Sequence, residues 1–421
     1  MARKMKDSGI EWIGEIPEGW SIARGKHILT LLQRAVFPTD GVITCFRDGE
    51  VTLRSNRRED GFTVSLKEIG YQGIEPGDLV VHGMDGFAGS IGISDSRGKS
   101  SPVLVVLDSS QDKKYLMYYL RSMAYNNVFL ALSTGIRVRS CDLKWNKLAD
   151  LLYLVPPIVE QHKLVSFLDE KFSEIDAMLS KTHASIEKYK KLKQAVITQA
   201  VTKGVRGKRE MKDSGVESIG EIPKEWVCEK IKYATSISRG LFNHRPRNDE
   251  RYYNGKYPFI QTSDVANATK YIVSYSQTLN ELGKSVSKEF PKGTLTMTIA
   301  ANVGDVAILN FDAYFPDSVV GFIPNKNIRT LYLFYVFSAM KDQFTRTAIK
   351  NTQLNLNIDR VKETFIPVTL DSNEQCEIEN YLESKCAEID GLIAKKEQLV
   401  KELESYKKSL IYEVVTGKRE V

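Results

Sequence analysis

The amino-acid sequence predicts an α+β protein of mixed helices and strands. We expect two globular domains joined by two long antiparallel helices in a coiled coil, as a pseudo-two-fold internal repeat. Residues 5–20 (MKDSGIEWIGEIPEGW) return at residues 211–226 as MKDSGVESIGEIPKEW, with twelve of the sixteen positions identical. A stretch with short β-like runs follows each copy. Each of these stretches then leads into a long helical pattern, at residues 160–202 and 373–416.

Each copy of the repeat is predicted to be a shaped loop that leads into a packed domain. Gly14 relaxes φ and Pro17 fixes it, and the second copy keeps both residue types. The closing tryptophan, Trp20 or Trp226, is predicted to anchor the loop. The expected boundaries are a repeat loop at 1–20, a first domain at 21–155, a central helix at 156–210, a second repeat loop and domain at 211–368, and a C-terminal helix at 369–421.

The stretch after the first tryptophan has the pattern of a mixed α and β domain. Residues Ile74–Ser94 contain a Pro-Gly turn, the strand LVV, a glycine-punctuated loop and the strand SIGI, and Pro102–Leu107 reads as a further buried strand. Residues Lys113–Phe129 have helical spacing. The second domain repeats this order, with its turn, strand, loop and strand at Phe290–Asn310 and a helical LYLFYVFSAMKDQF after them.

The long helical segments share one pattern. Between Glu160 and Thr202 there is neither glycine nor proline, and apolar residues recur in threes and fours, as in a heptad seam. A helix of this length measures roughly 65 Å. The second segment keeps the same phase at an offset of 214 residues, so that Glu160-Gln161 matches Glu374-Gln375.

The charge of the two segments predicts how they pair. Counting Asp, Glu, Lys and Arg, residues 156–210 carry a net charge of +4 and residues 369–421 carry −4. Helices of opposite sign with matched heptads are expected to pack against each other, and antiparallel pairing would put the two domains at opposite ends. The alternative is that each helix packs on its own domain.

Composition indicates an ordinary soluble protein. The chain has 421 residues, 27% charged and 42% hydrophobic, and a net charge of +6 that permits a polyanionic partner. Neither a signal-peptide pattern nor a membrane span is apparent, so we expect a cytoplasmic protein with no membrane partner. The five cysteines form no CxxC pair and are interpreted as structural thiols in a reducing compartment.

Catalytic and metal-binding signatures are absent from the sequence. There is no GxxxxGK[ST] loop, HExxH helix or GxSxG elbow, so we expect no catalytic residue, no metal site and no cofactor in this chain. The glycines at 83, 86, 89 and 92 are interpreted as a tight loop between strands, because no helix clearly follows them. His82 is interpreted as a hydrogen-bonding residue of that loop. The chain therefore reads as a binder.

Polar loops rich in arginine indicate nucleic acid as the ligand. Residues 21–155 carry a net charge of +3 and residues 227–368 carry +6. Arg, Lys, Asn and Gln pair with base edges, while Ser and Thr suit phosphates. For any one of these residues, a solvated surface loop remains the alternative. The candidate DNA-contacting residues are Arg54, Arg57, Arg58, His82, Arg137, Arg139, Arg239, Arg245, Arg247, Thr262, Ser263, Asn302, Ser318, Lys350, Gln353 and Asn355.

Over essentially its whole length, the chain resembles the specificity (S) subunit of type I restriction-modification systems. The duplicated order of its motifs carries this resemblance more than any single one of them. These motifs are the MKDSG–IGEIP–W loops, the junction VPPIVEQ (Val155–Gln161) with its weaker copy at Asn373-Glu374-Gln375, the helix endings AVTKG (Ala200–Gly204) and VVTGKREV (Val414–Val421), and GDLVVHGMDGFAGSIG, KGTLTMTIAANVGDVAIL, FIQTSDV and FPDSVVGFIP in the domains. The second junction departs from the family pattern, with LDSNEQ where a Pro-Pro is usual.

The resemblance implies a function and a set of partners. Each domain would be a target-recognition domain that reads one half of a split double-stranded DNA site. The helices would set the unread spacer and dock two modification (methyltransferase) subunits, and the repeat loops would be framework. S-adenosylmethionine, ATP and Mg would be bound by partner subunits, including restriction (helicase-nuclease) subunits, and this chain would be a non-catalytic recognition subunit. The alternatives are a coiled-coil scaffold with two protein-binding domains and a self-contained nuclease.

Overall fold

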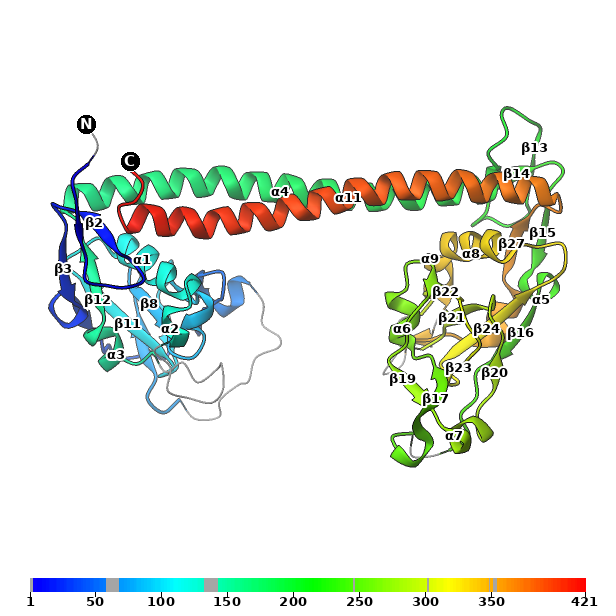
Figure 1. Ribbon diagram of the computed structural model, residues 1–421, viewed down its shortest axis with the longest axis horizontal. Helices are drawn as coiled ribbons and strands as arrows, with labels where there is room; N and C mark the ends of the chain where they lie inside the picture. The colour runs from blue at the N-terminus through cyan, green and yellow to red at the C-terminus, as the bar shows by residue number, and fades with distance from the viewer. Residues whose placement is uncertain are drawn as a thin grey trace. The chain divides into compact units, whose positions relative to one another are not determined.

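The structure is a computed structural model that describes residues 3–57, 68–131, 143–244, 247–300, 303–347, 349–350 and 354–421 (Figure 1). The chain divides into two compact units. The first comprises residues 1–183 and 397–421, and the second comprises residues 184–396. Each unit therefore contains one globular domain, one copy of the repeat and part of each long helix.

Each repeat forms a two-stranded antiparallel hairpin, where the sequence predicted only a shaped loop. The strands are β1 (Met5–Asp7) and β2 (Glu15–Pro17) in the first unit, and β13 (Met211–Asp213) and β14 (Glu221–Pro223) in the second. Gly14 and Gly220 have φ values of 71° and 72°, a backbone conformation that glycine adopts without strain. Trp20 and Trp226 are 1% and 0% exposed, so their predicted anchoring role is confirmed.

The first domain is built on a four-stranded antiparallel sheet. Its strands lie in the order β4 (Leu29–Leu31), β11 (Leu104–Ser109), β8 (Leu79–His82) and β9 (Ile91–Ile93). Smaller pairs are β3 (Ser21–Arg24) with β12 (Leu152–Val155), β5 (Ile43–Cys45) with β6 (Val51–Leu53), and β7 (Gln72–Ile74) with β10 (Gly98–Ser100); the helices are α1 (Lys113–Tyr125), α2 (Val128–Ala131) and α3 (Trp145–Asp150).

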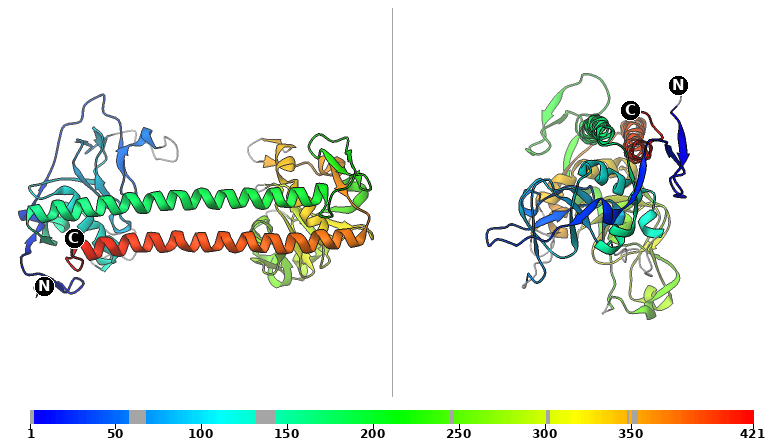
Figure 2. Two further views of the ribbon diagram at one scale, coloured as in Figure 1. Left: turned by 90° about the horizontal axis from the view of Figure 1, so that it is seen from above. Right: turned by 90° about the vertical axis from the view of Figure 1, so that its left-hand side faces the viewer.

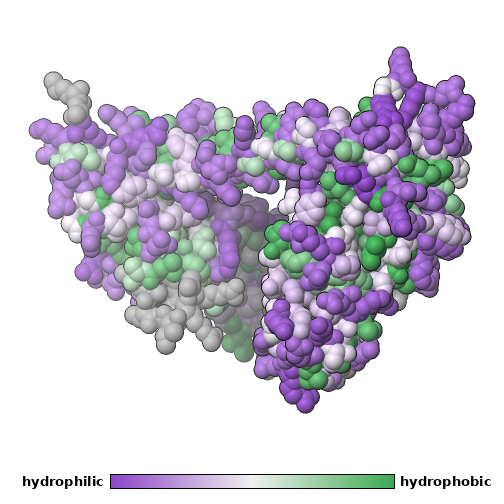
Figure 3. All heavy atoms as spheres, turned by 45° about the vertical axis from the view of Figure 1, so that its right-hand side comes forward, coloured by the Kyte–Doolittle hydropathy of each residue, from purple (hydrophilic) through white to green (hydrophobic). Residues whose placement is uncertain are grey.

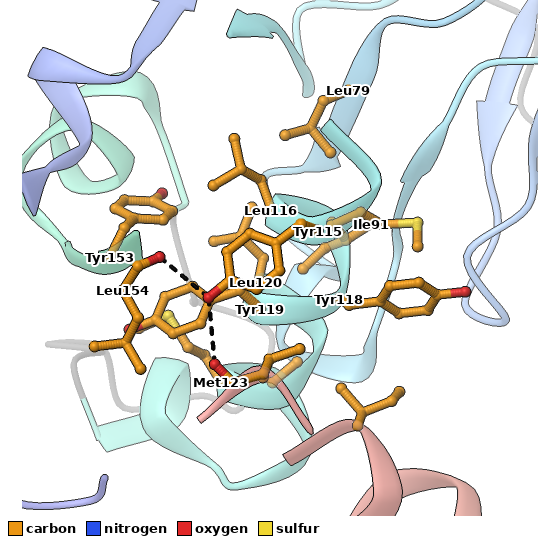
Figure 4. Close-up of a cluster of buried hydrophobic side chains, with 14 of the residues drawn as sticks. Leu79, Ile91, Tyr115, Leu116, Tyr118, Tyr119, Leu120, Met123, Tyr153 and Leu154 are labelled. Carbon is orange, nitrogen blue, oxygen red and sulfur yellow. Dashed lines mark hydrogen bonds between the residues drawn. The ribbon is translucent and has the colours of Figure 1, made fainter. Parts of the chain in front are cut away.

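Helix α1 packs its apolar side chains against the sheet and the long helices. Its N-terminus is capped by Asp112, whose carboxylate accepts hydrogen bonds from the backbone N–H groups of Lys114 and Tyr115. Figure 4 shows Tyr115 and Leu116 among buried neighbours such as Leu79. The predicted strands LVV, SIGI and Pro102–Leu107 correspond to β8, β9 and β11, and the predicted helical stretch corresponds to α1, so the structure confirms these four elements.

The second domain contains two sheets. The larger has the order β16 (Thr235–Arg239), β24 (Val319–Pro324), β21 (Leu295–Thr298), β22 (Val306–Leu309) and β18 (Tyr271–Ile272); the other has the order β19 (Gln277–Leu279), β17 (Tyr253–Phe259), β23 (Ala313–Tyr314) and β20 (Glu289–Phe290). The strand pairs are β15 (Val227–Lys230) with β27 (Phe365–Val368) and β25 (Ile349–Lys350) with β26 (Leu354–Asn355); the helices are α5 (Ile231–Ala234), α6 (Thr262–Asn267), α7 (Glu281–Ser285), α8 (Thr330–Ala339), α9 (Lys341–Thr347) and α10 (Ile358–Glu363). As in the first domain, an antiparallel pair joins the first strand after the tryptophan to the last strand before the long helix.

The long helices are α4 (Ile158–Lys203) and α11 (Ser372–Val415). Within each unit, part of α4 packs beside part of α11 in the opposite direction (Figure 2). In the first unit, Lys407 Nζ lies 2.8 Å from Asp176 Oδ1, and in the second, Lys193 Nζ lies 2.7 Å from Asp390 Oδ2. These pairs join basic and acidic side chains across the helix interface, so antiparallel pairing is confirmed.

Each domain also packs on both long helices of its unit. The first core combines α1 with Leu168 of α4 and Val414 of α11, and the second combines α8 with Val201 of α4 and Leu382 of α11. The two alternatives from the sequence are therefore not exclusive, since each helix packs on a domain and on the other helix.

Among the described residues, no helix combines the length and apolar character needed to span a bilayer. Hydrophilic side chains dominate the face shown in Figure 3.

Candidate nucleic-acid interface

A polar hollow in the first domain brings together three of the predicted DNA-contacting residues. Arg54, Arg57 and His82 all line this hollow, which has a volume of about 670 Å³. Arg54 and Arg57 follow strand β6, and His82 ends β8. The sequence placed these residues in separate stretches, and the packing of β5 and β6 near β8 and β9 unites them.

Acidic neighbours hold Arg47 and Arg57 in this hollow. Arg57 makes ion pairs with Asp48 at 2.6 Å and Glu50 at 3.1 Å, and its guanidinium lies 4.2 Å from the ring centroid of Phe46. Burial favours the neutral form of Asp48, but the hydrogen bonds from Arg57 and from the backbone N–H of Glu50 outweigh it and hold the pKa of Asp48 below its ordinary value. Arg47, from the same arginine-rich stretch as Arg54 and Arg57, pairs with Asp85 at 3.0 Å and also lines the hollow. Fixed guanidinium groups of this kind suit contacts to base edges or phosphates.

His82 is a hydrogen-bonding loop residue, as the sequence predicted. Its Nδ1 accepts hydrogen bonds from the backbone N–H groups of Met84 at 3.3 Å and Asp85 at 3.0 Å. Burial lowers the pKa of His82, although the carboxylate of Asp85 opposes this shift. Because Nδ1 accepts, the neutral ring carries its proton on Nε2, which makes this nitrogen a donor.

The glycines that follow His82 form a tight connection between β8 and β9, as expected. A 3₁₀ turn spans Gly86–Ala88, and Gly89 has a φ of 96°. A Cβ atom at Gly92 would lie 2.0 Å from the carbonyl oxygen of Gly49. These glycines thus allow a sharp turn and close strand packing, and after the single 3₁₀ turn the chain continues into strand β9 and not into an α-helix.

In the second domain, Asp317 brings three predicted residues together. Arg239 Nε donates to the backbone oxygen of Asp317 at 2.6 Å, and Arg247 pairs with its carboxylate. Ser318 is the next residue in the chain, and its carbonyl oxygen accepts from the backbone N–H of Ile299 at 2.9 Å. Asp317 did not stand out in the sequence, because a single acidic residue in a loop carries no periodic signal.

Other predicted residues lie elsewhere or outside the described chain. Thr262 and Ser263 begin the short helix α6, whose N-terminus is closed by a capping box between Gln261 and Asp264. The backbones of Lys350 and Asn355 form the β25–β26 pair, and their side chains are not described. Arg58, Arg137, Arg139, Arg245, Asn302 and Gln353 lie outside the described residues.

The Glu-Gln pair at the start of each long helix positions the domains, a role the sequence did not reveal. Gln161 Oε1 accepts from the backbone N–H of Asp112 at 2.9 Å, and its Nε2 donates to the carbonyl oxygen of Pro156 at 2.8 Å. Gln375 repeats this pattern with the N–H of Arg329 at 2.8 Å and the carbonyl of Thr369 at 2.7 Å. Both glutamines are 0% exposed. Each accepts a hydrogen bond from the backbone N–H of the residue that precedes the main helix of its domain, α1 or α8.

The neighbouring glutamates hold the repeat hairpins. Glu160 pairs with Arg3, and Glu374 pairs with Arg209 at 2.6 Å. Glu374 Oε2 also accepts from Trp226 Nε1 at 2.9 Å, and only 3% of its side chain is exposed. Within the described part of the chain, no three or more His, Cys, Asp or Glu side chains are arranged to hold a metal ion.

Comparisons with known proteins agree with this architecture. Residues 237–402 match the family model described as the type I restriction modification DNA specificity domain. A protein of Methanocaldococcus jannaschii described as the MjaX specificity subunit of a type I restriction enzyme is 23% identical over 431 residues, covering 96% of this chain and 95% of that protein. The EcoKI specificity subunit of Escherichia coli strain K12 is 23% identical over 211 residues, covering 45% of this chain and 44% of that one.

Solved structures share the fold over nearly the whole chain. A chain from a structural study of assembly and conformational transition in the type I R-M system has a TM-score of 0.73 and 13% identity, covering 96% of this chain and 99% of that chain. The HsdS subunit of Thermoanaerobacter tengcongensis has a TM-score of 0.52 and 14% identity, with coverage of 96% and 98%. The chain therefore has the fold of a type I specificity subunit, and the resemblance to this family seen in its sequence is confirmed.

Proposed function

We propose that this chain is the DNA sequence-recognition subunit of a type I restriction-modification complex, in which each domain reads one half of a bipartite site. One observation carries the proposal: two domains of different sequence are held by the same frame. The frame consists of the two repeat hairpins, β1–β2 and β13–β14, and the long helices α4 and α11. Gln161 and Gln375 make matching hydrogen bonds at the two junctions. A repeated frame that presents two unlike surfaces suits a ligand with two unlike recognition elements and an unread spacer.

The chemistry of the first domain supports DNA as the ligand. The hollow around Arg54, Arg57 and His82 presents planar cationic donors, and the carboxylates beside Arg57 fix its geometry. Such preorganised arginines favour base-edge contacts, whereas mobile surface lysines would serve phosphates without sequence preference.

The frame is proposed to dock two modification subunits, one on each repeat. These partners would supply S-adenosylmethionine-dependent methylation, and restriction subunits would supply Mg- and ATP-dependent translocation and cleavage. In this assignment the chain itself contributes recognition and spacing and no catalytic group. The hairpins are suited to docking because they are nearly identical in sequence in the two units.

A domain exchange tests the proposal. Residues 227–368 are replaced by the corresponding domain of a homologue, and the complex is reconstituted with its modification subunits. Sequencing of methylated DNA should show that one half of the site changes while the other half and the spacer persist. A change in both halves, or binding without sequence preference, would contradict the proposed division of labour.

A point variant tests the hollow. Arg57→Ala should weaken specific DNA binding by about 10- to 100-fold and relax the preference at one base pair. Arg24→Ala is the matched control, because Arg24 is an exposed arginine of the same unit that pairs with Asp150 outside the hollow. Equal losses in the two variants would indicate a diffuse charge effect. Affinity that does not fall with salt would favour the scaffold alternative.

A further inference from the structure

In the second unit, helix α8 lies beside the long helices (Figure 1). Side chains of α8, α4 and α11 line a cavity there. Its volume is about 490 Å³, within the range of small-molecule sites. Three of its lysines are paired with carboxylates: Lys193 with Asp390 at 2.7 Å, Lys341 with Asp305 at 2.6 Å, and Lys270 with Glu383. The wall is therefore polar but balanced in charge.

The first unit fills the equivalent position with a phenylalanine. Phe172 of α4 is 8% exposed, and its ring packs edge-on against Tyr118, with centroids 5.4 Å apart and an interplanar angle of 81°. Lys407 Nζ lies 4.6 Å from the centroid of the same ring. The ring thus has two specific partners, one aromatic and one cationic.

The second unit keeps both partners and lacks the ring. Cys386 stands 214 residues after Phe172, the offset that relates the two long helices, and it lines the cavity. Tyr335 takes the place of Tyr118: Tyr118 donates its hydroxyl to Asp169 at 2.6 Å, and Tyr335 donates to the equivalent Glu383. Lys193 takes the place of Lys407, because each bonds the matching aspartate of the facing helix.

We propose that this cavity binds an uncharged aromatic ring of a small molecule, at the position that the Phe172 ring occupies in the first unit. Tyr335 would contact the ring edge-on, and Lys193 would lie over its face. An uncharged ring is favoured because the three cavity lysines already have carboxylate partners. A charged ligand would leave one of these pairs broken in a partly buried site.

A second cavity of the same unit provides an internal contrast. It measures about 330 Å³ and is lined by Ser218, Val336 and Thr198. In the first unit, Trp12 lies at the position equivalent to Ser218, with ring centroids 6.1 Å from Tyr119 and 6.2 Å from Tyr412. In the second unit, Ser218 stands in place of the Trp12 ring, and Val336 and Thr198 stand in place of its aromatic partners Tyr119 and Tyr412. This cavity has no preserved ring partner and is not expected to bind one.

The test uses the full chain with indole and benzyl alcohol as probes, followed by calorimetry and saturation-transfer NMR. Cys386→Phe supplies the ring from within the chain and should lower probe affinity at least tenfold. Ser218→Trp is the matched control: it fills the other cavity, and binding should be unchanged. Lys193→Met, which keeps the cavity and removes the cation, should weaken binding several-fold.

Several outcomes would overturn the proposal. They are no binding of either probe by the unaltered chain, unchanged binding in both Cys386→Phe and Lys193→Met, or an equal loss in Ser218→Trp. If Cys386→Phe fails to fold, the Lys193→Met result alone decides, because Lys193 is partly exposed and its loss leaves the apolar packing intact. DNA recognition does not enter these measurements, so the outcome is independent of the proposed function.

Discussion

The two units carry the same frame but differ in the side chains that connect the frame to its domain. In the second unit, Trp226 Nε1 bonds Glu374, whereas among the described residues the equivalent Trp20 Nε1 is buried with no hydrogen-bond partner. In the first unit, Phe172 and Trp12 fill space that Cys386 and Ser218 leave open in the second. The difference shows that side-chain contacts between frame and domain vary, while the glutamine contacts persist.

The largest expected effect concerns the glutamates. Glu374→Ala should reduce the free energy of unfolding of the second unit by about 3–5 kcal/mol, because it leaves the guanidinium of Arg209 and the indole N–H of Trp226 without their buried partner. Glu160→Ala should lower the stability of the first unit by less than about 1 kcal/mol, since 23% of that side chain is exposed. Hydrogen exchange of each unit under urea measures both values. Equal losses of stability in Glu374→Ala and Glu160→Ala would contradict the expected difference between the two units.

A cavity variant in the first unit comes next. Phe172→Cys reproduces the second unit's residue and should destabilise the first unit by about 2–4 kcal/mol, through lost burial and the cavity that remains. Thermal unfolding with hydrogen exchange as the local probe measures the loss. A change below 1 kcal/mol would mean that α4, α11 and α1 collapse around the smaller side chain.

The two glutamines should behave alike. Gln161→Ala and Gln375→Ala each remove hydrogen bonds to buried backbone groups, and each should destabilise its own unit by about 1–3 kcal/mol. Urea unfolding of the two variants side by side gives the comparison. A severalfold difference between them would show that the junctions are equivalent in geometry but not in energy.

The smallest effect is a pH dependence near the end of the second domain. Lys230 and Lys232 hold the pKa of Glu363 at about 2, below its ordinary value of 4.5. The pairing therefore stabilises the folded state above pH 4.5, and this contribution is lost as the pH falls toward 2. Glu363→Gln should flatten the acid dependence of second-unit stability in this window. At the equivalent place in the first unit, Asp150 lies 3.7 Å from Arg24, and both side chains are exposed.

Much of the fold could be predicted from the sequence, because it rests on periodic patterns. The heptads and opposite net charges of residues 156–210 and 369–421 predicted the antiparallel helices. The ion pairs of Lys193 with Asp390 and of Lys407 with Asp176 confirm the pairing, but each helix supplies one lysine and one aspartate, so the difference in net charge does not explain them. The hairpins were read as loops, because three-residue strands such as Met5–Asp7 are too short to show alternation.

The candidate site could be predicted only in part. Arg54, Arg57 and His82 were selected from composition, and the structure places them in one hollow. Arg47 belongs to the same arginine-rich stretch as Arg54 and Arg57, but its pairing with Asp85 leaves no signal in the sequence. Asp317 did not stand out because its partner Arg247 lies 70 residues away along the chain. The recurrence of Glu160-Gln161 as Glu374-Gln375 is visible in the sequence. The hydrogen bonds that these glutamines make to backbone groups of other segments leave no signal there.

The glutamine junctions have a consequence for how the two domains can diverge. Gln161 and Gln375 bond the N–H of Asp112 and Arg329, two residues of opposite charge, in the same way. Since every residue except proline offers an N–H, an attachment through main-chain atoms is insensitive to the side chains of the attached domain. A domain with an unrelated surface can therefore attach to the same frame, provided that the residue before its main helix places its backbone N–H beside the glutamine.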